Sequence, residues 1–380
     1  MQIPLYRSRF ALMLSAVACV LLLVSADAAA KTYYLAPNGS NSSSRNGSSA
    51  QPWKSLTYAS GRMTSSDDLI LKAGTYNYTG TQYFSRSGKS NNWITIRAAN
   101  NAEVTLDFSG NRTQFTEAIR ITGNYINFQN INVRNNSRGG GIEMSGHHVG
   151  INGCDVYNIG GSAIQAFGNT NNWSNTPNHI TIAWCNVWNT CRMNDPNFWN
   201  YQGWADQGGF WPFAVGGRNA RNVKVRNCWV GENFGEGICL NRVRGGNSEV
   251  KNCYTRDNYS VNIYIDSVRG DNGNWVDVVG NVSESTGKRK FYRDNYPAQN
   301  FTVASELYTD LTGNNFTNRV YFGGNSAVDG VNNYYVGDLG GNVSNVKFNN
   351  NTSTSPVYND YLRDNSSKIW SINVRPTNSW

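Results

Sequence analysis

Charged residues make up only 15% of this 380-residue chain, which also holds just 9 Pro and 3 His. The chain is poor in Ala, Leu, Glu and Lys, the residues on which helix-rich proteins depend. Beyond the N-terminal region, no segment approaches the roughly twenty consecutive apolar residues that a transmembrane helix needs. These shortages exclude a helical bundle and leave no transmembrane anchor to expect.

What the chain has in quantity is Asn and Gly, with 56 and 38 residues respectively. Both residue types serve tight turns and left-handed backbone positions. The 12 Trp, 21 Tyr and 15 Phe supply enough apolar surface to exclude a disordered chain. The composition therefore predicts a β-rich domain with many turns.

The first thirty residues have the pattern of a secretory signal peptide. Two arginines precede an apolar run over residues 10–24, and three alanines at 28–30 form a small-residue cleavage site. We therefore expect residues 1–30 to be removed and residues 31–380 to form a secreted protein, extracellular or periplasmic. Removal takes away two of the 33 basic residues and one of the 25 acidic ones, which leaves a net charge of +7.

An exported basic protein that is rich in aromatic residues suits an anionic or carbohydrate-rich partner. The alternative interpretation, that the charge only maintains solubility, stays open. Because export separates the protein from intracellular nucleic acid, we do not expect nucleic acid as a partner.

One short pattern repeats along the chain: two apolar residues spaced by one, then Cys or Asn three positions on. The intervals between its last members are 25, 26 and 28 residues, or 31, 43 and 44 where the unit carries an insertion. Those last members are Cys154, Cys185, Cys228, Cys253, Asn281, Asn325 and Asn351.

A second short segment with apolar alternation lies between successive copies. Alternation over four or five residues is typical of a half-buried strand. Strands repeated every ~25 residues and separated by Asn/Gly turns predict a parallel β-helix, whose coils stack so that equivalent residues form columns. The predicted second strands are residues 118–122, 141–145, 163–167, 237–241, 262–266 and 302–306.

The N-terminal residues are expected to form a cap over residues 31–76, with a helix at 53–63. This region contains the motifs Tyr33-Tyr34-Leu35, Asn38-Gly39-Ser40, Pro52-Trp53-Lys54 and Ala73-Gly74-Thr75-Tyr76. In these motifs the chain resembles the secreted right-handed parallel β-helix proteins of the pectin-lyase-like superfamily. The resemblance implies an all-β, single-domain fold and a monomer, and we expect a C-terminal cap over 356–380.

The resemblance specifies the fold more closely than the activity. The group includes polysaccharide lyases, glycosidases, uronate epimerases and non-catalytic surface proteins. This chain lacks the pectate-lyase Arg-x-Pro-x-x-Arg and alginate-epimerase Asp-Pro-His-Asp motifs. Related lyases use Lys or Arg as the base, often with calcium, so calcium is the cofactor that the resemblance suggests.

Six Cys follow the signal segment, and four of them share the repeated column. We expect a ladder of small buried residues, continued by Asn amides that bond from coil to coil, while disulfides between adjacent coils stay open as an alternative. A zinc site is not expected, because no CxxC pair or nearby His completes a ligand set. His148 and His179 hold the same position in their repeats and are expected to stack.

Insertions in a solenoid project from one face and build binding sites. Two insertions, residues 191–211 and 287–300, leave the coil at the same corner, three coils or ~14 Å apart. The first is aromatic and the second basic, so they should face each other as walls of a sugar-binding groove. The residues predicted to bind substrate are Trp199, Tyr201, Trp204, Trp211, Tyr259, Tyr264 and Arg293.

The coils between these walls supply the candidate catalytic groups. Asp266 and Glu306 should lie in one column about 5 Å apart, a carboxylate pair that could share a proton, hold a cation or hydrolyse a glycoside. Glu236 lies on the same predicted floor. Basic groups that could act as a base or bind uronate carboxylates are Arg242, Arg256 and Lys290.

The leading hypothesis is an exported lyase that cleaves an acidic, uronate-containing polysaccharide by β-elimination. Such a reaction needs a base and a cation that neutralises the uronate carboxylate. Hydrolysis by Asp266 and Glu306 is the alternative within the enzyme class. A non-catalytic glycan-binding surface protein is the alternative outside it.

Overall fold

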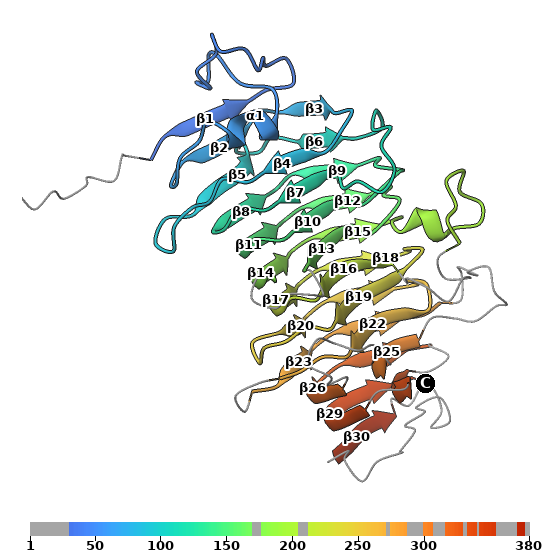
Figure 1. The fold of residues 1–380 in the computed structure, drawn as a ribbon. Coiled ribbons are helices and arrows are strands. Elements are labelled where there is room, and N and C mark those ends of the chain that lie inside the picture. The colour runs from blue at the N-terminus through green and yellow to red at the C-terminus, as the bar shows by residue number, and fades with distance from the viewer. Residues whose placement is uncertain are drawn as a thin grey trace, which may run out of the picture.

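The structure is a computed structural model that describes residues 30–168, 176–203, 212–270, 274–286, 299–306, 316–329, 333–339, 342–354 and 371–376. Short strands follow one another around a stack of coils, and all strand pairs with an assigned register are parallel (Figure 1). The predicted all-β parallel β-helix is confirmed. The predicted signal peptide lies outside the described residues. No helix in the described parts of the chain is long and apolar enough to cross a membrane.

Each coil contributes up to three strands, so the stack has three strand rows. Two rows join into one sheet of 21 strands, and the third row is a separate sheet of nine strands. The first row of the large sheet consists of β1 (Thr32–Leu35), β2 (Asp68–Leu71), β5 (Ile94–Ala98), β8 (Ile126–Gln129), β11 (His147–Asn152), β14 (Asn178–Ala183), β17 (Arg221–Arg226), β20 (Glu249–Lys251), β23 (Val276–Val279), β26 (Phe316–Gly323), β29 (Asn342–Ser353) and β30 (Ser371–Pro376).

The second row also ends on the long strand β29. It consists of β3 (Gly74–Asn77), β6 (Val104–Asp107), β9 (Asn132–Arg134), β12 (Asp155–Tyr157), β15 (Asn186–Trp188), β18 (Trp229–Gly231), β21 (Tyr254–Arg256), β24 (Val282–Glu284) and β27 (Ser326–Val328).

The nine-stranded sheet contains all six strands predicted from the second pattern. It runs β4 (Gln82–Phe84), β7 (Ile119–Ile121), β10 (Ile142–Met144), β13 (Ile164–Phe167), β16 (Phe213–Arg218), β19 (Glu236–Asn241), β22 (Val261–Asp266), β25 (Gln299–Glu306) and β28 (Tyr334–Leu339).

The two helical segments of the described chain are short. Helix α1 (Leu56–Ser60) is capped by Ser55, whose side chain accepts a hydrogen bond from Tyr58 N. It is shorter than the helix predicted over 53–63. A 3-10 turn, η2 (Arg192–Asn194), lies in the first predicted insertion.

The core is one continuous stack of inward-facing side chains. Val149, Ile180 and Val223, for example, pair in register on three successive coils and are fully or almost fully buried. A second inward column, which passes through Val278, ends in aromatic rings: Phe322 stacks on Phe348 with 4.8 Å between ring centroids. Alternation along each strand therefore supplies the apolar interior that holds the coils together.

The predicted Cys/Asn column is confirmed. Cys154 and Cys185 immediately precede the paired residues Asp155 and Asn186, and the six described cysteines are all buried and free, so the disulfide alternative is not realised among them. Burial raises the pKa of the Cys191 thiol, which keeps it protonated and unreactive.

Asparagine amides continue this column as a hydrogen-bonded ladder. Asn325 Oδ1 accepts from both the backbone N and the Nδ2 of Asn281, each at 3.0 Å. Asn351 Oδ1 repeats the arrangement toward Asn325, at 3.0 and 2.9 Å. The predicted His148–His179 stack is also confirmed, with ring centroids 4.5 Å apart and an interplanar angle of 7°.

The ladder makes a testable prediction about stability. Asn325→Ala would remove the acceptor of two buried donors on Asn281 and the donor to Val278 O at 2.8 Å. Because each buried group left unsatisfied costs about 1–3 kcal/mol, we expect a loss of roughly 3 kcal/mol in the free energy of unfolding. Denaturant unfolding measures it, with Asn349→Ala, an exposed asparagine on β29, as the control. Equal effects of the two substitutions would contradict a structural role for the ladder.

Candidate functional site

The outer face of the nine-stranded sheet carries charged and aromatic side chains in register. Arg120, Glu143 and Gln165 pair across β7, β10 and β13, each between two inward-facing apolar residues. Two residues further along, Phe167 pairs with Arg218, Arg218 with Asn241, and Asn241 with Asp266. The face therefore has an N-terminal half on β7–β13 and a C-terminal half on β16–β22.

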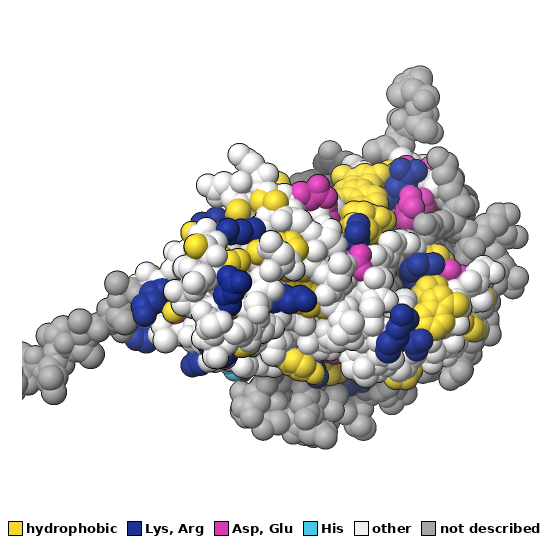
Figure 2. Space-filling view, turned by 90° about the horizontal axis from the view of Figure 1, so that it is seen from above, with side chains coloured by type: hydrophobic (Ala, Val, Ile, Leu, Met, Phe, Trp, Pro, Cys, Tyr) yellow, Lys and Arg dark blue, Asp and Glu magenta, His cyan; other side chains and the backbone are white. Residues whose placement is uncertain are grey.

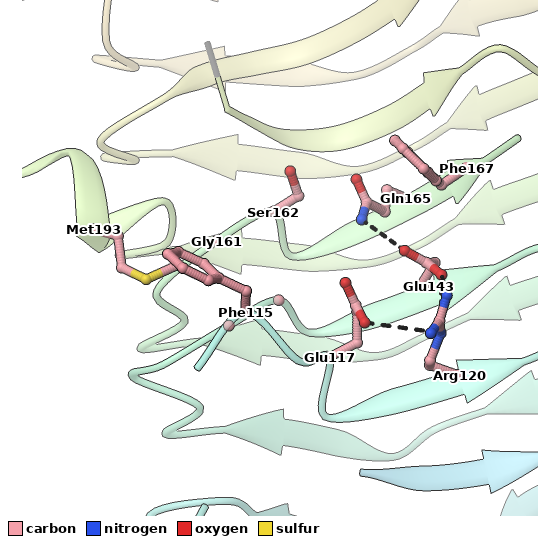
Figure 3. A pocket seen from close by; sticks show the side chains of 11 residues that line it. Phe115, Glu117, Arg120, Glu143, Gly161, Ser162, Gln165, Phe167 and Met193 are labelled. Atoms are coloured by element: carbon pink, nitrogen blue, oxygen red, sulfur yellow. Dashed lines mark hydrogen bonds and ion pairs between the residues drawn. The ribbon is translucent and has the colours of Figure 1, made fainter. Parts of the chain in front are cut away.

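The N-terminal half contains a pocket of about 360 Å³, within the size range of small-molecule sites. Glu117, Arg120, Glu143 and Gln165 project into it, with Phe115 and Met193 on one side and Phe167 on the other (Figure 3). Gly140 keeps the floor open, because a Cβ there would lie 3.1 Å from Ser162 O and 3.3 Å from Glu117 Cγ.

The charges in the pocket form one connected chain. Arg120 donates from Nη2 and Nε to the same Glu143 oxygen, at 2.6 and 3.0 Å, and its Nε lies 3.8 Å from Glu117. Gln165 Nε2 donates to the other Glu143 oxygen at 3.2 Å. Glu143 is buried, but Arg120 compensates its charge and both of its carboxylate oxygens accept hydrogen bonds.

Glu117 is the titrating group of this pocket. Burial, and then the negative charge of Glu143, raise the pKa of Glu117 to about 7, although Arg120 acts in the opposite direction. A carboxyl group with such a pKa exchanges a proton near neutral pH, so it can donate or accept a hydrogen bond there.

The described part of the first insertion, residues 191–203, forms a wall beside the pocket. Asn200 exchanges hydrogen bonds with Gln114, at 3.1 and 3.3 Å, and Arg138 lies over the Trp199 ring at 4.7 Å. Asn194 Nδ2 donates to Phe234 O at 2.8 Å, so the wall spans both halves of the face. Trp199 is 62% exposed, as the sugar-binding prediction requires, and Tyr201 is half-buried.

Exposed aromatic rings concentrate around the pocket. Of the six large hydrophobic side chains exposed in the described residues, four lie on or beside the N-terminal half of this face. These four are Tyr83, Phe115, Phe167 and Trp199.

Figure 2 views the molecule from its N-terminal end, where the few acidic side chains in view lie near hydrophobic ones and basic side chains are spread more widely.

The C-terminal half holds a buried polar network. Asp266 is fully buried, and it accepts hydrogen bonds from Asn241 Nδ2 and, at 2.8 Å, from Ser267 Oγ. Glu236 is also buried, at the start of β19. Arg218 lies half-buried at the edge of this network, next to Asn241 in register.

Arg218 is electrostatically linked to this network. Burial lowers the pKa of the Arg218 guanidinium and the charge of Arg242 adds to the effect, while Cys239, Glu236 and Asp266 oppose it. Arg242 is half-buried, at the turn position that Asn219 and Ser267 occupy on the neighbouring coils. Arg218 is thus coupled electrostatically to a second arginine and to two buried carboxylates, Glu236 and Asp266.

The predicted Asp266–Glu306 pair is wrong. Asp266 pairs with Ala304, and Glu306 pairs with Leu339 one coil further on. Ile263 lies beside Phe301 and Ile265 beside Val303, so β25 is shifted by two residues from the predicted register. The shift moves Glu306 about 7 Å along the strand from the position opposite Asp266.

Arg256 does not share a strand row with Glu236 and Asp266. It ends β21 in the large sheet and lies 3.4 Å from Asp257 and 3.6 Å from Glu284, which offset its charge. Tyr264 is buried in a small outer cluster with Phe213 and Cys239, whereas Tyr259 is half-buried in the turn before β22.

Several predicted residues cannot be placed on this face. Most of the basic insertion is not described, so the predicted pairing of two facing walls stays a prediction. The residues outside the described parts are Trp204, Trp211, Lys290 and Arg293.

The sequence prediction missed the pocket and Arg218. Residues 118–122, 141–145 and 163–167 were each predicted as strands, and aligning them places Arg120, Glu143 and Gln165 at the same central position. That alignment was the available signal. Arg218 carried none, because the strand β16 that holds it follows an insertion and was not predicted.

The suggested calcium has no ligand set in the described residues. Among them, no three His, Cys, Asp or Glu side chains lie close enough together to hold a metal ion.

The comparisons with known proteins agree with this architecture. A family model described as "Pel9A-like, right handed beta helix region" matches residues 33–300, more than two thirds of the chain. The protein therefore belongs to the Pel9A-like right-handed β-helix family, and the resemblance to pectin-lyase-like proteins is confirmed.

Individual relatives match less completely. Pectate lyase L of Dickeya chrysanthemi is 35% identical over 137 residues, 33% of this chain and 31% of that protein, so the chain aligns with about a third of its length. The crystal structure of pectate lyase Pel9A has a TM-score of 0.58 at 19% identity and covers 91% of this chain and 78% of its own. A rhamnogalacturonan lyase has a TM-score of 0.66 at 14% identity, covering 90% and 87%. At such identities the two structures show a shared fold.

The pocket makes a prediction about pH. Because the pKa of Glu117 is raised in the fold, its contribution to stability is present below its unfolded pKa and lost as pH rises from about 4.5 to about 7. Glu117→Gln should remove this loss, so the variant gains stability relative to the wild type with rising pH, by up to about 3 kcal/mol above pH 7. Thermal unfolding from pH 4 to 8 measures it. A difference that does not change with pH would show that Glu117 titrates normally.

Proposed function

We propose that this protein is an exported polysaccharide lyase that cleaves a uronate-containing polysaccharide by β-elimination. Family membership supports it, as do the name of the relative pectate lyase L and the excess of basic residues. The observation that carries the proposal is the electrostatically coupled pair of Arg218, at the end of β16 in the nine-stranded sheet, and Arg242, in the turn directly after β19. A polyuronate needs cationic groups there, because each sugar brings a carboxylate.

The reaction removes the proton beside the uronate carboxylate and breaks the bond to the neighbouring glycosidic oxygen. A carbon–carbon double bond forms in the uronate, and the departing oxygen takes up a proton, so no water is consumed. Arg218 is proposed as the base, because burial and the charge of Arg242 both favour its neutral form.

Arg242 is proposed to bind the uronate carboxylate. A guanidinium can donate two parallel hydrogen bonds to a carboxylate, which stabilises the charge that develops during proton removal. The buried carboxylates Glu236 and Asp266 would hold the two arginines in place. Hydrolysis is the weaker candidate, because the carboxylate pair on which it depended is out of register.

The proposal is tested with purified protein on pectate, alginate and glycosaminoglycans, with and without calcium. We expect ultraviolet absorbance of an unsaturated uronate product from at least one of them. New reducing ends without this absorbance would indicate a hydrolase. Retention on a polysaccharide column with neither signal would indicate binding alone.

Substitutions at the two arginines should separate their roles. Arg218→Ala should lower kcat by roughly 10²–10⁴-fold, with a smaller loss in Arg218→Lys, because a base is removed or replaced. Arg242→Ala should raise KM for a uronate polymer by about 10–100-fold, because a charge-assisted hydrogen bond is lost. Arg97→Ala, on β5 of the other sheet, is the control. Equal losses in Arg97→Ala and Arg218→Ala would remove Arg218 from the reaction.

A further inference from the structure

We propose that the pocket on β7, β10 and β13 is a subsite for an uncharged sugar unit, beside the position where the uronate is cleaved. The inference rests on the proposed lyase function for its account of the neighbouring uronate, but the binding chemistry of the pocket is independent of it. Nothing in the family match or in the relatives assigns a role to this pocket.

The first argument is charge. Arg120 is the cation that lines the pocket among the described residues, and it forms ion pairs with two carboxylates, Glu143 and Glu117. Glu143 accepts hydrogen bonds from two N–H groups of Arg120, so the Arg120–Glu143 pair is close to neutral. Glu117 adds a partial negative charge near pH 7. A uronate carboxylate placed here would therefore be repelled, whereas an uncharged sugar would not.

The second argument is the kind of polar group present. Carboxylate oxygens, the Gln165 amide and the Ser162 hydroxyl line one cavity. These groups accept and donate hydrogen bonds to hydroxyl groups without requiring a charged ligand. Since Glu117 can be protonated or ionised near neutral pH, it can donate a hydrogen bond to a sugar hydroxyl oxygen or accept one from a sugar hydroxyl hydrogen.

The third argument is the exposed aromatic surface. Phe115 is 57% exposed and Phe167 is 37% exposed, and they lie on opposite sides of the pocket (Figure 3). Aromatic rings suit the apolar faces of sugar rings, and leaving two phenylalanines in water has no benefit for the fold. The cavity of about 360 Å³ between them offers room for a sugar unit.

The fourth argument is position. Phe167 is the register partner of Arg218, so the wall of the pocket and the proposed base lie on adjacent strands, about 4.8 Å apart. Glu143 lies two strands from Arg218 and two residues along the strand, or roughly 12 Å away. A chain that presents its uronate to Arg218 would therefore present a nearby unit to the pocket. A polymer that contains both uronates and neutral sugars can satisfy both positions, and a homopolyuronate does not.

The test uses calorimetry at pH 7 with galacturonate oligomers and with the same oligomers after carboxyl reduction, which replaces each carboxylate by an uncharged hydroxymethyl group. Phe167→Ala should weaken binding of the reduced oligomers about two- to tenfold and change binding of the charged ones less than about twofold. Glu143→Gln should tighten binding of the charged oligomers, because Arg120 would lose its nearest counter-ion and keep only Glu117, 3.8 Å away. Trp184→Ala, an exposed aromatic outside the nine-stranded sheet, is the matched control.

Two results would overturn the inference: equal weakening of both oligomer sets by Phe167→Ala, or an unchanged ratio of affinities in Glu143→Gln. If buried Glu143 cannot be replaced without unfolding, the binding data for the exposed Phe167→Ala variant still test the inference.

Loss of lyase activity on every polymer would remove the proposed function, whereas the binding difference would persist and support the pocket alone. In an active enzyme, KM for rhamnogalacturonan, which alternates uronate and neutral sugar, should rise in Phe167→Ala while KM for polygalacturonate stays within about twofold.

Discussion

The whole molecule depends on parallel hydrogen bonding in register between successive coils. Because each strand pairs with the equivalent strand of the next coil, each strand residue lies about 4.8 Å from the equivalent residue of that coil. Side chains must therefore be compatible with their own column. Inward columns meet this condition with Val, Ile and Phe, and at the bend with cysteines and amides that bond to each other, as Asn281 does to Asn325.

The same constraint acts on the outer face, where it produces chemistry. Opposite charges in adjacent coils attract at this spacing, and in this column Arg120 is followed by Glu143 and then by the neutral Gln165. In the next column the series Phe167, Arg218, Asn241 and Asp266 separates the cation from the anion by an amide. Stacking thus converts a periodic sequence into a face whose polarity changes from coil to coil, which is what a polymer with unlike sugar units requires.

The period of about 25 residues was sufficient to predict the fold, the Cys/Asn column and the histidine stack, because each follows from equivalence between coils. It could not fix the register of β25. A register error of one residue would have turned Val303 outward, which the hydrophobic pattern excludes. An error of two residues leaves the alternation of inward and outward residues unchanged, so the pattern cannot detect it. Pairing Glu306 with Asp266 therefore agreed with the pattern, although Ala304 holds that place. The large Phe301 packs beside Tyr334, with ring centroids 5.0 Å apart, and this contact accompanies the observed register.

The pocket illustrates a different limit of sequence reasoning. The column of Arg120, Glu143 and Gln165 follows from alignment alone, but its meaning depends on side-chain contacts that alignment does not give. If Arg120 pointed away from Glu143, its guanidinium could bind a uronate carboxylate instead. Because Arg120 bonds to Glu143 and Glu143 also accepts from Gln165, the charge is neutralised and the pocket favours hydroxyl groups. The distinction between an acidic and a neutral sugar is thus made by one ion pair between neighbouring coils, and the stacking of the solenoid brings the two partners of that pair together.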